Sequence, residues 1–234
     1  MLLLSLINTK TKFRVNIAQK LVMSSIGVKR RASNAPSNST DKVVVAYQGA
    51  KGAFTFLATQ HFFRTKAHEV ELTAHQSLKA IYDSLLKEKV TYGFVPLESS
   101  SYGTIHGVYD RLVATEGKIE IVGEFGQIEH FCLCIAKDTV QELDITKVLG
   151  HPHILECCSD YLDSLDSRRQ IAGRPLVVRV AVNDSSSACA MVSSTRHEEG
   201  VIAAIGSREG AEIHDLKILV SGVGNDKNAE VREG

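Results

Sequence analysis

The sequence has no apolar run that approaches the ~18–20 residues a helix needs to cross a bilayer. It also has no net charge, because 27 Lys and Arg residues balance 27 Asp and Glu residues. A neutral chain gives no support to nucleic-acid binding or to attachment at a membrane surface, so we expect neither partner. The chain has 234 residues, of which 44% are hydrophobic and 23% charged. This is the ordinary composition of a globular protein with a sizeable core.

Cysteines with the spacing of a redox or zinc motif are also missing. The five cysteines, Cys132, Cys134, Cys157, Cys158 and Cys189, include no C-x-x-C pair, and their number is odd. A disulfide framework is therefore not expected, and reduced thiols in a reducing compartment are the default. The spacing of structural zinc ligands is absent as well, so we expect no metal.

Acidic residues are absent from residues 1–40, which carry seven Lys and Arg residues and are rich in Ser and Asn. The other 20 basic residues then face all 27 acids, which gives residues 41–234 a net charge of −7. An acid-free basic segment is typical of an organelle transit peptide, which would direct the protein to a mitochondrion or plastid. The alternatives are a disordered basic tail or a true start at Met23, either of which fits a cytoplasmic protein. In each case we expect residues 1–40 to lie outside the fold.

Beyond residue 41, short β-branched runs alternate with amphipathic stretches. This alternation predicts mostly parallel sheets covered by helices, and the segment is long enough for two such sheets. The predicted strands are residues 43–47, 92–97, 119–125, 131–136, 176–182 and 201–205. The predicted helices follow residue 54, cover 78–85 behind a Ser77 cap, cover 105–114, begin near Pro152, and cover 185–194.

Two polar segments are candidate binding sites. The Gly49-x-x-Gly52 turn stands between a predicted strand and a helix, where free N–H groups attract anions, although taken alone it fits an ordinary turn somewhat better. Residues 96–103 hold a cluster of hydroxyl side chains at the end of a strand, where open α/β sheets bind ligands. A capped turn leading into a helix is the structural alternative for this cluster.

A third candidate is His151-Pro152-His153, which stands beside Cys157 and Cys158. The spacing is poor for a metal site, and we favour a core or capping role for His151. A thiol enzyme using Cys157 or Cys158 is the least favoured hypothesis, because both residues belong to the apolar side of a predicted helix or lie next to it, where thiols are usually inert.

Six segments of the chain resemble, in order, the motifs of the prephenate and arogenate dehydratase family. The first is similar to the opening motif of that family, and the next resembles its Pro-x-Glu-Asn-Ser motif. The others resemble the crossover to a second lobe, a Ser-His-Pro-Gln motif, a later helix, and the approach to a terminal Thr-Arg-Phe motif. The similarity covers about residues 42–232 and rests on residues 47–55, 92–100, 121–130, 150–153, 211–216 and 225–232.

The resemblance implies a two-lobed α/β fold like the type-two periplasmic binding proteins, with mostly parallel sheets and the active site between the lobes. It places lobe 1 at about residues 42–118 plus 208–234, and lobe 2 at about 119–207. The implied substrate is a small anion, prephenate or arogenate, converted without cofactor or metal to phenylpyruvate or phenylalanine, in L-phenylalanine biosynthesis. A homo-oligomer or a pairing with an active homologue is expected. No residues remain after the last motif for a phenylalanine-binding ACT domain.

The motifs depart from the family at several positions. Val231 occupies the place of the threonine that assists the leaving hydroxyl, Ser99 replaces an asparagine, and His153 replaces a glutamine. If the chain is active, the resemblance implies that Ser99, His153 and Arg232 carry the chemistry, with His153 as the acid. The other site residues carried over are Gly49, Gly52, Thr55, Glu98, Ser100, Gly103, His151 and Ser185.

The retained and lost residues leave two hypotheses. One is a dehydratase with weakened activity, since losing a general acid costs about 10²–10⁴-fold in rate. The other is an inactive relative that binds a small carboxylate or regulates a partner.

Overall fold

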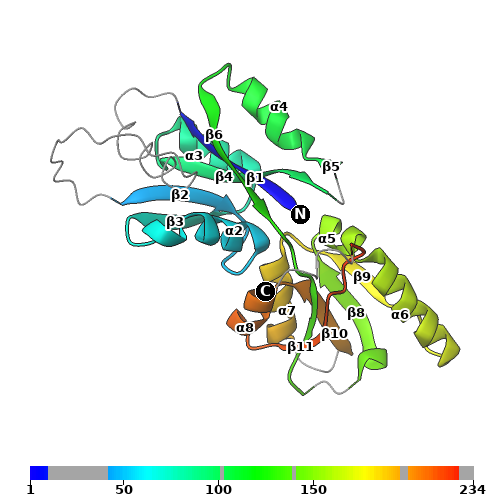
Figure 1. Ribbon diagram of the computed structural model, residues 1–234. Helices are drawn as coiled ribbons and strands as arrows, with labels where there is room; N and C mark the ends of the chain where they lie inside the picture. The colour runs from blue at the N-terminus through cyan, green and yellow to red at the C-terminus, as the bar shows by residue number, and fades with distance from the viewer. Residues whose placement is uncertain (10–41, 101–102, 139–140, 196–199, 227–234) are drawn as a thin grey trace.

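The computed structural model describes residues 1–9, 42–100, 103–138, 141–195 and 200–226. They form two α/β lobes, each built on its own sheet, with β6 reaching from the first lobe toward the second (Figure 1). This two-lobed architecture confirms the predicted fold class. No helix among these ranges is both long enough and apolar enough to pass through a membrane.

The first sheet has the strand order β3-β2-β4-β1-β6, with β5 paired to β4. Helix α2 covers one face, where Ala58 and Phe62 pack on the sheet, and α3 and α4 cover the other through residues such as Ile81 and Val108. The strands are β1 (Leu2–Thr9), β2 (Val43–Gln48), β3 (Val70–His75), β4 (Tyr92–Ser99), β5 (Gly103–Thr104) and β6 (Ile119–Gln127). The helices are α2 (Phe54–Phe62), η1 (Arg64–Lys66), α3 (Leu78–Leu86) and α4 (His106–Ala114).

The second sheet has the order β11-β7-β10-β8-β9. Helices α5 and α6 pack on one face through Ile154, Leu162 and Leu165, and α7 and α8 pack on the other through Cys189 and Ala211. The strands are β7 (Cys132–Ile135), β8 (Ile145–Gly150), β9 (Val178–Ala181), β10 (Val201–Gly206) and β11 (Lys217–Ser221). The helices are η2 (Glu142–Asp144), α5 (Pro152–Cys157), α6 (Ser159–Ile171), α7 (Ser185–Ser194) and α8 (Arg208–Ile213).

Both sheets are mixed, so antiparallel pairing is more frequent than predicted. Strands β3, β2 and β4 are parallel, and so are β10, β8 and β9. Strands β1 and β7 pair antiparallel with both of their neighbours. Alternation of strands and helices predicts the parallel part only, because an antiparallel neighbour needs no helical crossover.

The exclusion of residues 1–40 from the fold is wrong for residues 2–9. These form β1, which lies between β4 and β6 and pairs with both, and its side chains Leu4, Leu6 and Ile7 are fully buried. A strand in this place satisfies the backbone groups of two neighbours that would otherwise be free edges. Cleavage of a leader after residue 9 would therefore remove the middle of the sheet. Residues 10–41 lie outside the described part of the chain.

The predicted boundary between the lobes also differs from the structure. Strand β6 belongs to the first sheet, although the resemblance places it in lobe 2. Helix α8 and strand β11 belong to the second lobe, although the resemblance places them in lobe 1. The crossover is therefore residues 128–131, directly after β6.

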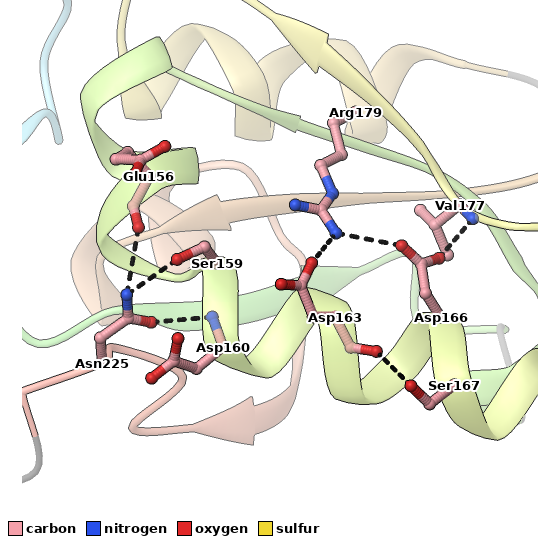
Figure 2. Close-up of polar contacts among 9 residues, drawn as sticks. All are labelled: Glu156, Ser159, Asp160, Asp163, Asp166, Ser167, Val177, Arg179 and Asn225. Atoms are coloured by element: carbon pink, nitrogen blue, oxygen red, sulfur yellow. Dashed lines mark hydrogen bonds and ion pairs between the residues drawn. The ribbon is translucent and has the colours of Figure 1, made fainter.

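Polar contacts tie α6 to its surroundings in the second lobe (Figure 2). Arg179 of β9 donates to Asp163 at 2.5 Å and to Asp166 at 3.0 Å. At the other end of the helix, the amide of Asn225 donates to Ser159 Oγ at 2.9 Å and accepts from the backbone N–H of Asp160 at 3.1 Å. The segment that follows β11 is thereby held against the start of α6.

Replacing Leu6 by alanine tests the place of β1. Because the side chain is fully buried between α2 and the sheet, Leu6→Ala should lower the free energy of unfolding by about 2–5 kcal/mol, measured by urea denaturation. The matched control is Leu176→Ala, whose side chain is 52% exposed and should change the value by less than about 0.5 kcal/mol. Equal, small effects in both variants would show that residues 2–9 do not belong to the folded domain.

Candidate active site

A cavity of about 230 Å³ lies between the two lobes, with its wall contributed by both. This is below the roughly 300 Å³ at which pockets for drug-sized ligands begin, so it fits a small molecule. The lining residues come from the end of β2, the start of α2, the end of β4, the crossover, and the starts of α5 and α7. They include Gln48, Gly49, Phe54, Thr55, Pro96, Ser99, Ile105, Glu129, Phe131, His151, His153, Ile154, Cys157, Asn183, Asp184 and Ser185.

The first lobe contributes a glycine turn and two hydroxyl groups. Gly49 has a φ of +90°, and a side chain there would approach the Cβ atom of Asp184 to 3.3 Å, so the turn requires glycine for its conformation and for close contact with the second lobe. The hydroxyl of Thr55 donates to the backbone carbonyl of Gln48. Ser99 ends β4 and is only 7% exposed.

The second lobe contributes two histidines at the start of α5. His151 is the N-cap, and its Nδ1 accepts from the backbone N–H of His153 at 3.3 Å. The two rings meet edge to face, with their centres 4.8 Å apart. Burial lowers the pKa of both imidazoles, and for His151 the neighbouring His153 adds to the effect. Near neutral pH both rings are therefore uncharged.

Asp184 stands at the N-cap of α7, on the wall of the cavity beside Ser185. Its carboxylate accepts from the backbone N–H of Ser187 at 2.8 Å and from the Ser187 hydroxyl at 2.7 Å. An acidic cap is stabilised by the free N–H groups and the dipole of the helix that it begins. The cavity therefore contains one carboxylate that the fold itself holds in position.

The crossover places a second carboxyl group, that of Glu129, in the wall of the cavity. Burial raises the pKa of Glu129 to about 7, and the positive charge of the Met1 amino group partly opposes this rise. Among the described lining residues none is a lysine or arginine. The described residues of the cavity wall are thus neutral or acidic, whereas a binding site for an anion is expected to be cationic.

The two lobes are docked through the segment that joins β2 to α2. Phe54 belongs to the apolar core of the second lobe and meets Phe131 edge to face at 5.3 Å. The hydroxyl of Ser186 donates to the Lys51 carbonyl at 2.6 Å, and the hydroxyl of Ser207 donates to the Gly52 carbonyl at 3.0 Å. Both serines are almost completely buried, so these bonds are shielded from water.

Six of the predicted site residues line the cavity: Gly49, Thr55, Ser99, His151, His153 and Ser185. Gly52 does not line it. A side chain at Gly52 would lie 3.0 Å from Ile213 Cδ1 and 3.3 Å from Gly210 Cα, so its role in the structure is to let the turn contact α8. Val231 and Arg232 lie outside the described residues.

Glu98, Ser100 and Gly103 are exposed and do not line the cavity. Successive side chains of a strand point to opposite faces, so Glu98 faces away from the wall that its neighbour Ser99 joins. Ser100 accepts a hydrogen bond from the Met1 amino group at 2.8 Å. Of the predicted hydroxyl cluster, Ser99 therefore lines the cavity and Ser100 does not.

The cavity also contains residues that sequence reasoning missed, above all Glu129 and Asp184. Asp184 carried a usable signal, because an aspartate directly before a run of serines is a helix N-cap pattern. Glu129 stands between Ile128 and His130, which are both exposed, so its surroundings in the sequence do not indicate burial. The direction of its side chain depends on how the two lobes meet.

The described residues offer no metal centre and no activated thiol. Among the described ranges, no three His, Cys, Asp or Glu side chains group as a metal-ligand set. All five cysteines are buried and none forms a disulfide, and burial raises the pKa of Cys158 well above its usual range. A protonated thiol is a poor nucleophile, which disfavours the thiol-enzyme hypothesis.

The fold defines a two-lobed α/β protein whose lobes enclose a cavity of small-molecule size. The prephenate dehydratase family model matches residues 45–232, and the chain belongs to that family.

Three comparisons describe the similarity. Arogenate dehydratase 3, chloroplastic, from Arabidopsis thaliana is 29% identical over 188 residues, which are 80% of this chain and 40% of that protein. The prephenate dehydratase of Arthrobacter aurescens, solved with L-Phe, has a TM-score of 0.60 at 16% identity, covering 79% of this chain and 56% of that one. GqqA, described as a quorum-quenching acylase, has a TM-score of 0.58 at 22% identity, covering 78% and 60%.

The chain spans about half or less of the length of the curated relatives that it matches. The two structural matches show the fold alone, and the acylase shows that the same fold carries different chemistry.

Replacing Ser207 by alanine tests the docking of the lobes. The variant leaves the Gly52 carbonyl and the Gly210 N–H without their partner in a buried place. We expect a loss of about 1–3 kcal/mol in the free energy of unfolding, measured by urea denaturation. Ser194→Ala is the control, because that hydroxyl is exposed at the end of α7. A loss no larger than that of the control would refute the buried contact between the lobes.

Proposed function

We propose that the cavity between the lobes binds prephenate or arogenate and promotes the decarboxylating dehydration of that ring. The observation that carries the proposal is the convergence of motif residues on one wall. Thr55, Ser99 and His151 come from three different family motifs, Ser185 begins helix α7, and all four line a single small cavity. Family membership and a cavity of suitable size support the same assignment.

The protein has to supply little of the driving force for this reaction. The ring carboxylate leaves as carbon dioxide, its bonding electrons enter the ring, and the ring hydroxyl departs with its electron pair and takes up a proton to form water. Aromatisation drives these steps, so the site has to hold the substrate and stabilise the departing hydroxide. The first lobe offers the hydroxyl of Ser99 for this hydrogen bond, whereas the hydroxyl of Thr55 already donates to the Gln48 carbonyl.

If the leaving hydroxyl takes its proton from the threonine position, as in the family, this site supports the reaction only at a reduced rate. Val231 has no proton to donate, and burial lowers the pKa of His153, so that a protonated imidazole is scarce near neutral pH. A neutral imidazole is about as weak an acid as a hydroxyl group, so His153 offers no stronger proton donor than the threonine of the family. Losing such a donor costs about 10²–10⁴-fold in rate.

Arg232 remains our proposed partner for a substrate carboxylate. Support comes from Asn225, whose backbone N–H donates to the carbonyl of the cavity residue Cys157 at 2.7 Å. Arg232 lies seven residues further along the sequence and outside the described residues, so its role rests on the family motif.

Between the two substrates, the described wall favours arogenate. Both carry two carboxylates, but arogenate also carries an ammonium group. The Asp184 carboxylate offers that group a partner, whereas prephenate has a keto group in its place, which a carboxylate does not attract. The second candidate function, a binding or regulatory module without turnover, is favoured by the missing threonine hydroxyl at Val231.

Incubation of the whole chain with prephenate and with arogenate tests the proposal. We expect saturable product formation above the rate in buffer, with the larger kcat/KM for arogenate. A rate equal to that of buffer, together with a raised Tm in the presence of either compound, would leave the binding module as the function. Neither turnover nor a Tm shift would refute both candidates.

Restoring the threonine of the family motif provides a gain-of-function test. Val231→Thr adds a hydroxyl to a side chain of nearly the same shape and should raise kcat by at least about 10-fold, toward the 10²–10⁴-fold of a general acid. Val231→Ala, which changes the side chain without adding a donor, is the control. A gain in both variants, or in neither, would show that the hydroxyl at this position does not govern the rate.

The location in a mitochondrion or plastid stays a prediction. The Arabidopsis relative is named chloroplastic, which supports it. A processing site within residues 1–40 conflicts with the central position of β1 in the first sheet.

A further inference from the structure

Glu129 differs from every other ionisable residue in the wall of the cavity. Asp184 is occupied as a helix cap, and His151 and His153 face each other at the start of α5. Glu129 comes from the crossover, the segment that joins the two lobes in the described part of the chain, where it has no hydrogen-bond partner. A desolvated carboxyl group without a partner in a ligand cavity needs an explanation, because such a group costs folding free energy.

The reaction itself needs what this residue can supply. Hydroxide is a poor leaving group, and a proton delivered as the C–O bond breaks converts it to water. The family threonine is absent, since its place is taken by Val231, and the two histidines of the wall are uncharged near neutral pH. Of the ionisable residues described in the wall, Glu129 is the strongest acid that can be protonated near neutral pH.

We propose that Glu129 donates the proton to the hydroxyl that leaves the substrate ring, an assignment that rests on the proposed dehydratase function. The O–H bond of the carboxylic acid breaks as the ring C–O bond breaks, which yields water and the Glu129 carboxylate. The electrons left by carbon dioxide enter the ring, and solvent returns a proton to Glu129 after product release. No cofactor is required for this balance.

The acidity of the group fits the task. An ordinary glutamate, with a pKa of 4.5, is almost fully ionised at neutral pH, whereas burial raises the pKa of Glu129 to about 7 and leaves roughly half of it protonated there. A general acid works best when its pKa lies near the operating pH. The ionisable groups around Glu129 are the Met1 amino group of β1, Cys158 behind α5, and His151, His153, Cys157 and Asp184 of the cavity wall.

Glu129→Gln is the decisive variant, because it keeps the size and hydrogen bonding of the side chain but cannot donate a proton to the leaving group. We expect kcat to fall by about 10²-fold or more while the Tm shift on substrate binding is retained. In the wild-type chain kcat should fall as the pH rises through about 7, and this limb should vanish in the variant. Glu129→Asp, which keeps an acid with a shorter reach, should retain more activity than Glu129→Gln.

The matched control is Glu124→Gln, an exposed position on β6 in the same segment, which should leave kcat and its pH dependence unchanged. A second measurement is independent of turnover. Because the folded pKa lies above the ordinary 4.5, the contribution of Glu129 to stability is present below pH 4.5 and is lost as the pH rises to about 7. The Tm of Glu129→Gln relative to wild type should therefore increase across that interval.

The outcomes separate this proposal from the one on which it rests. Wild-type turnover combined with an unchanged kcat and pH limb in Glu129→Gln would overturn the role of Glu129 and leave the dehydratase function standing. A wild-type chain without turnover would overturn both. A Tm difference that does not depend on pH would show that Glu129 is an ordinary exposed acid, and would also overturn the assignment.

Discussion

The structure depends on the docking of one short segment, residues 49–54, onto the second lobe. Phe54 completes an apolar core that belongs to the other sheet, and two buried serines bind the carbonyls of Lys51 and Gly52. Without these contacts the ends of β2 and β4 would face solvent, and the starts of α5 and α7 would have no opposing wall. The cavity is a consequence of this docking, because each lobe supplies only half of its surface.

The elements that depend on local sequence were predictable, and the ones that depend on distant pairing were not. Strand β2, helix α3 with its Ser77 cap, and helix α7 follow from periodicity and capping residues. The helix predicted behind Pro152 is two helices that meet at Cys158. Strand β1 was missed because its apolar residues are embedded in a segment whose overall composition is basic and polar. Nothing within residues 2–9 indicates that their partners are about 90 and 120 residues away.

About half of the candidate site could be predicted from motifs. Thr55, Ser99, His151 and Ser185 converge as the family resemblance implies, because each stands at an element end that faces the other lobe. Glu98 does not line the cavity because side chains alternate along β4, so that it points to the face opposite Ser99. Ser100 follows the end of the strand and contacts the Met1 amino group instead. Glu129 and Asp184 could not be placed without the lobe docking, since their position in the wall depends on contacts between both halves of the chain.

The burial of Glu129 links the fold of the crossover to its chemistry. A half-buried carboxyl group in the wall of a cavity between two lobes destabilises the folded state when ionised, and natural proteins accept such a local conflict chiefly at functional sites. The desolvation that raises the pKa of Glu129 also lowers the stability of the folded state at higher pH. The same desolvation keeps the carboxyl group of Glu129 partly protonated near neutral pH. Replacing Glu129 by glutamine would relieve the loss of stability at higher pH and would remove the acidic proton. Under the proposed dehydratase function, Val231 stands where the family motif has its threonine, and Glu129 in the segment that joins the lobes has the acidity that the proton transfer demands.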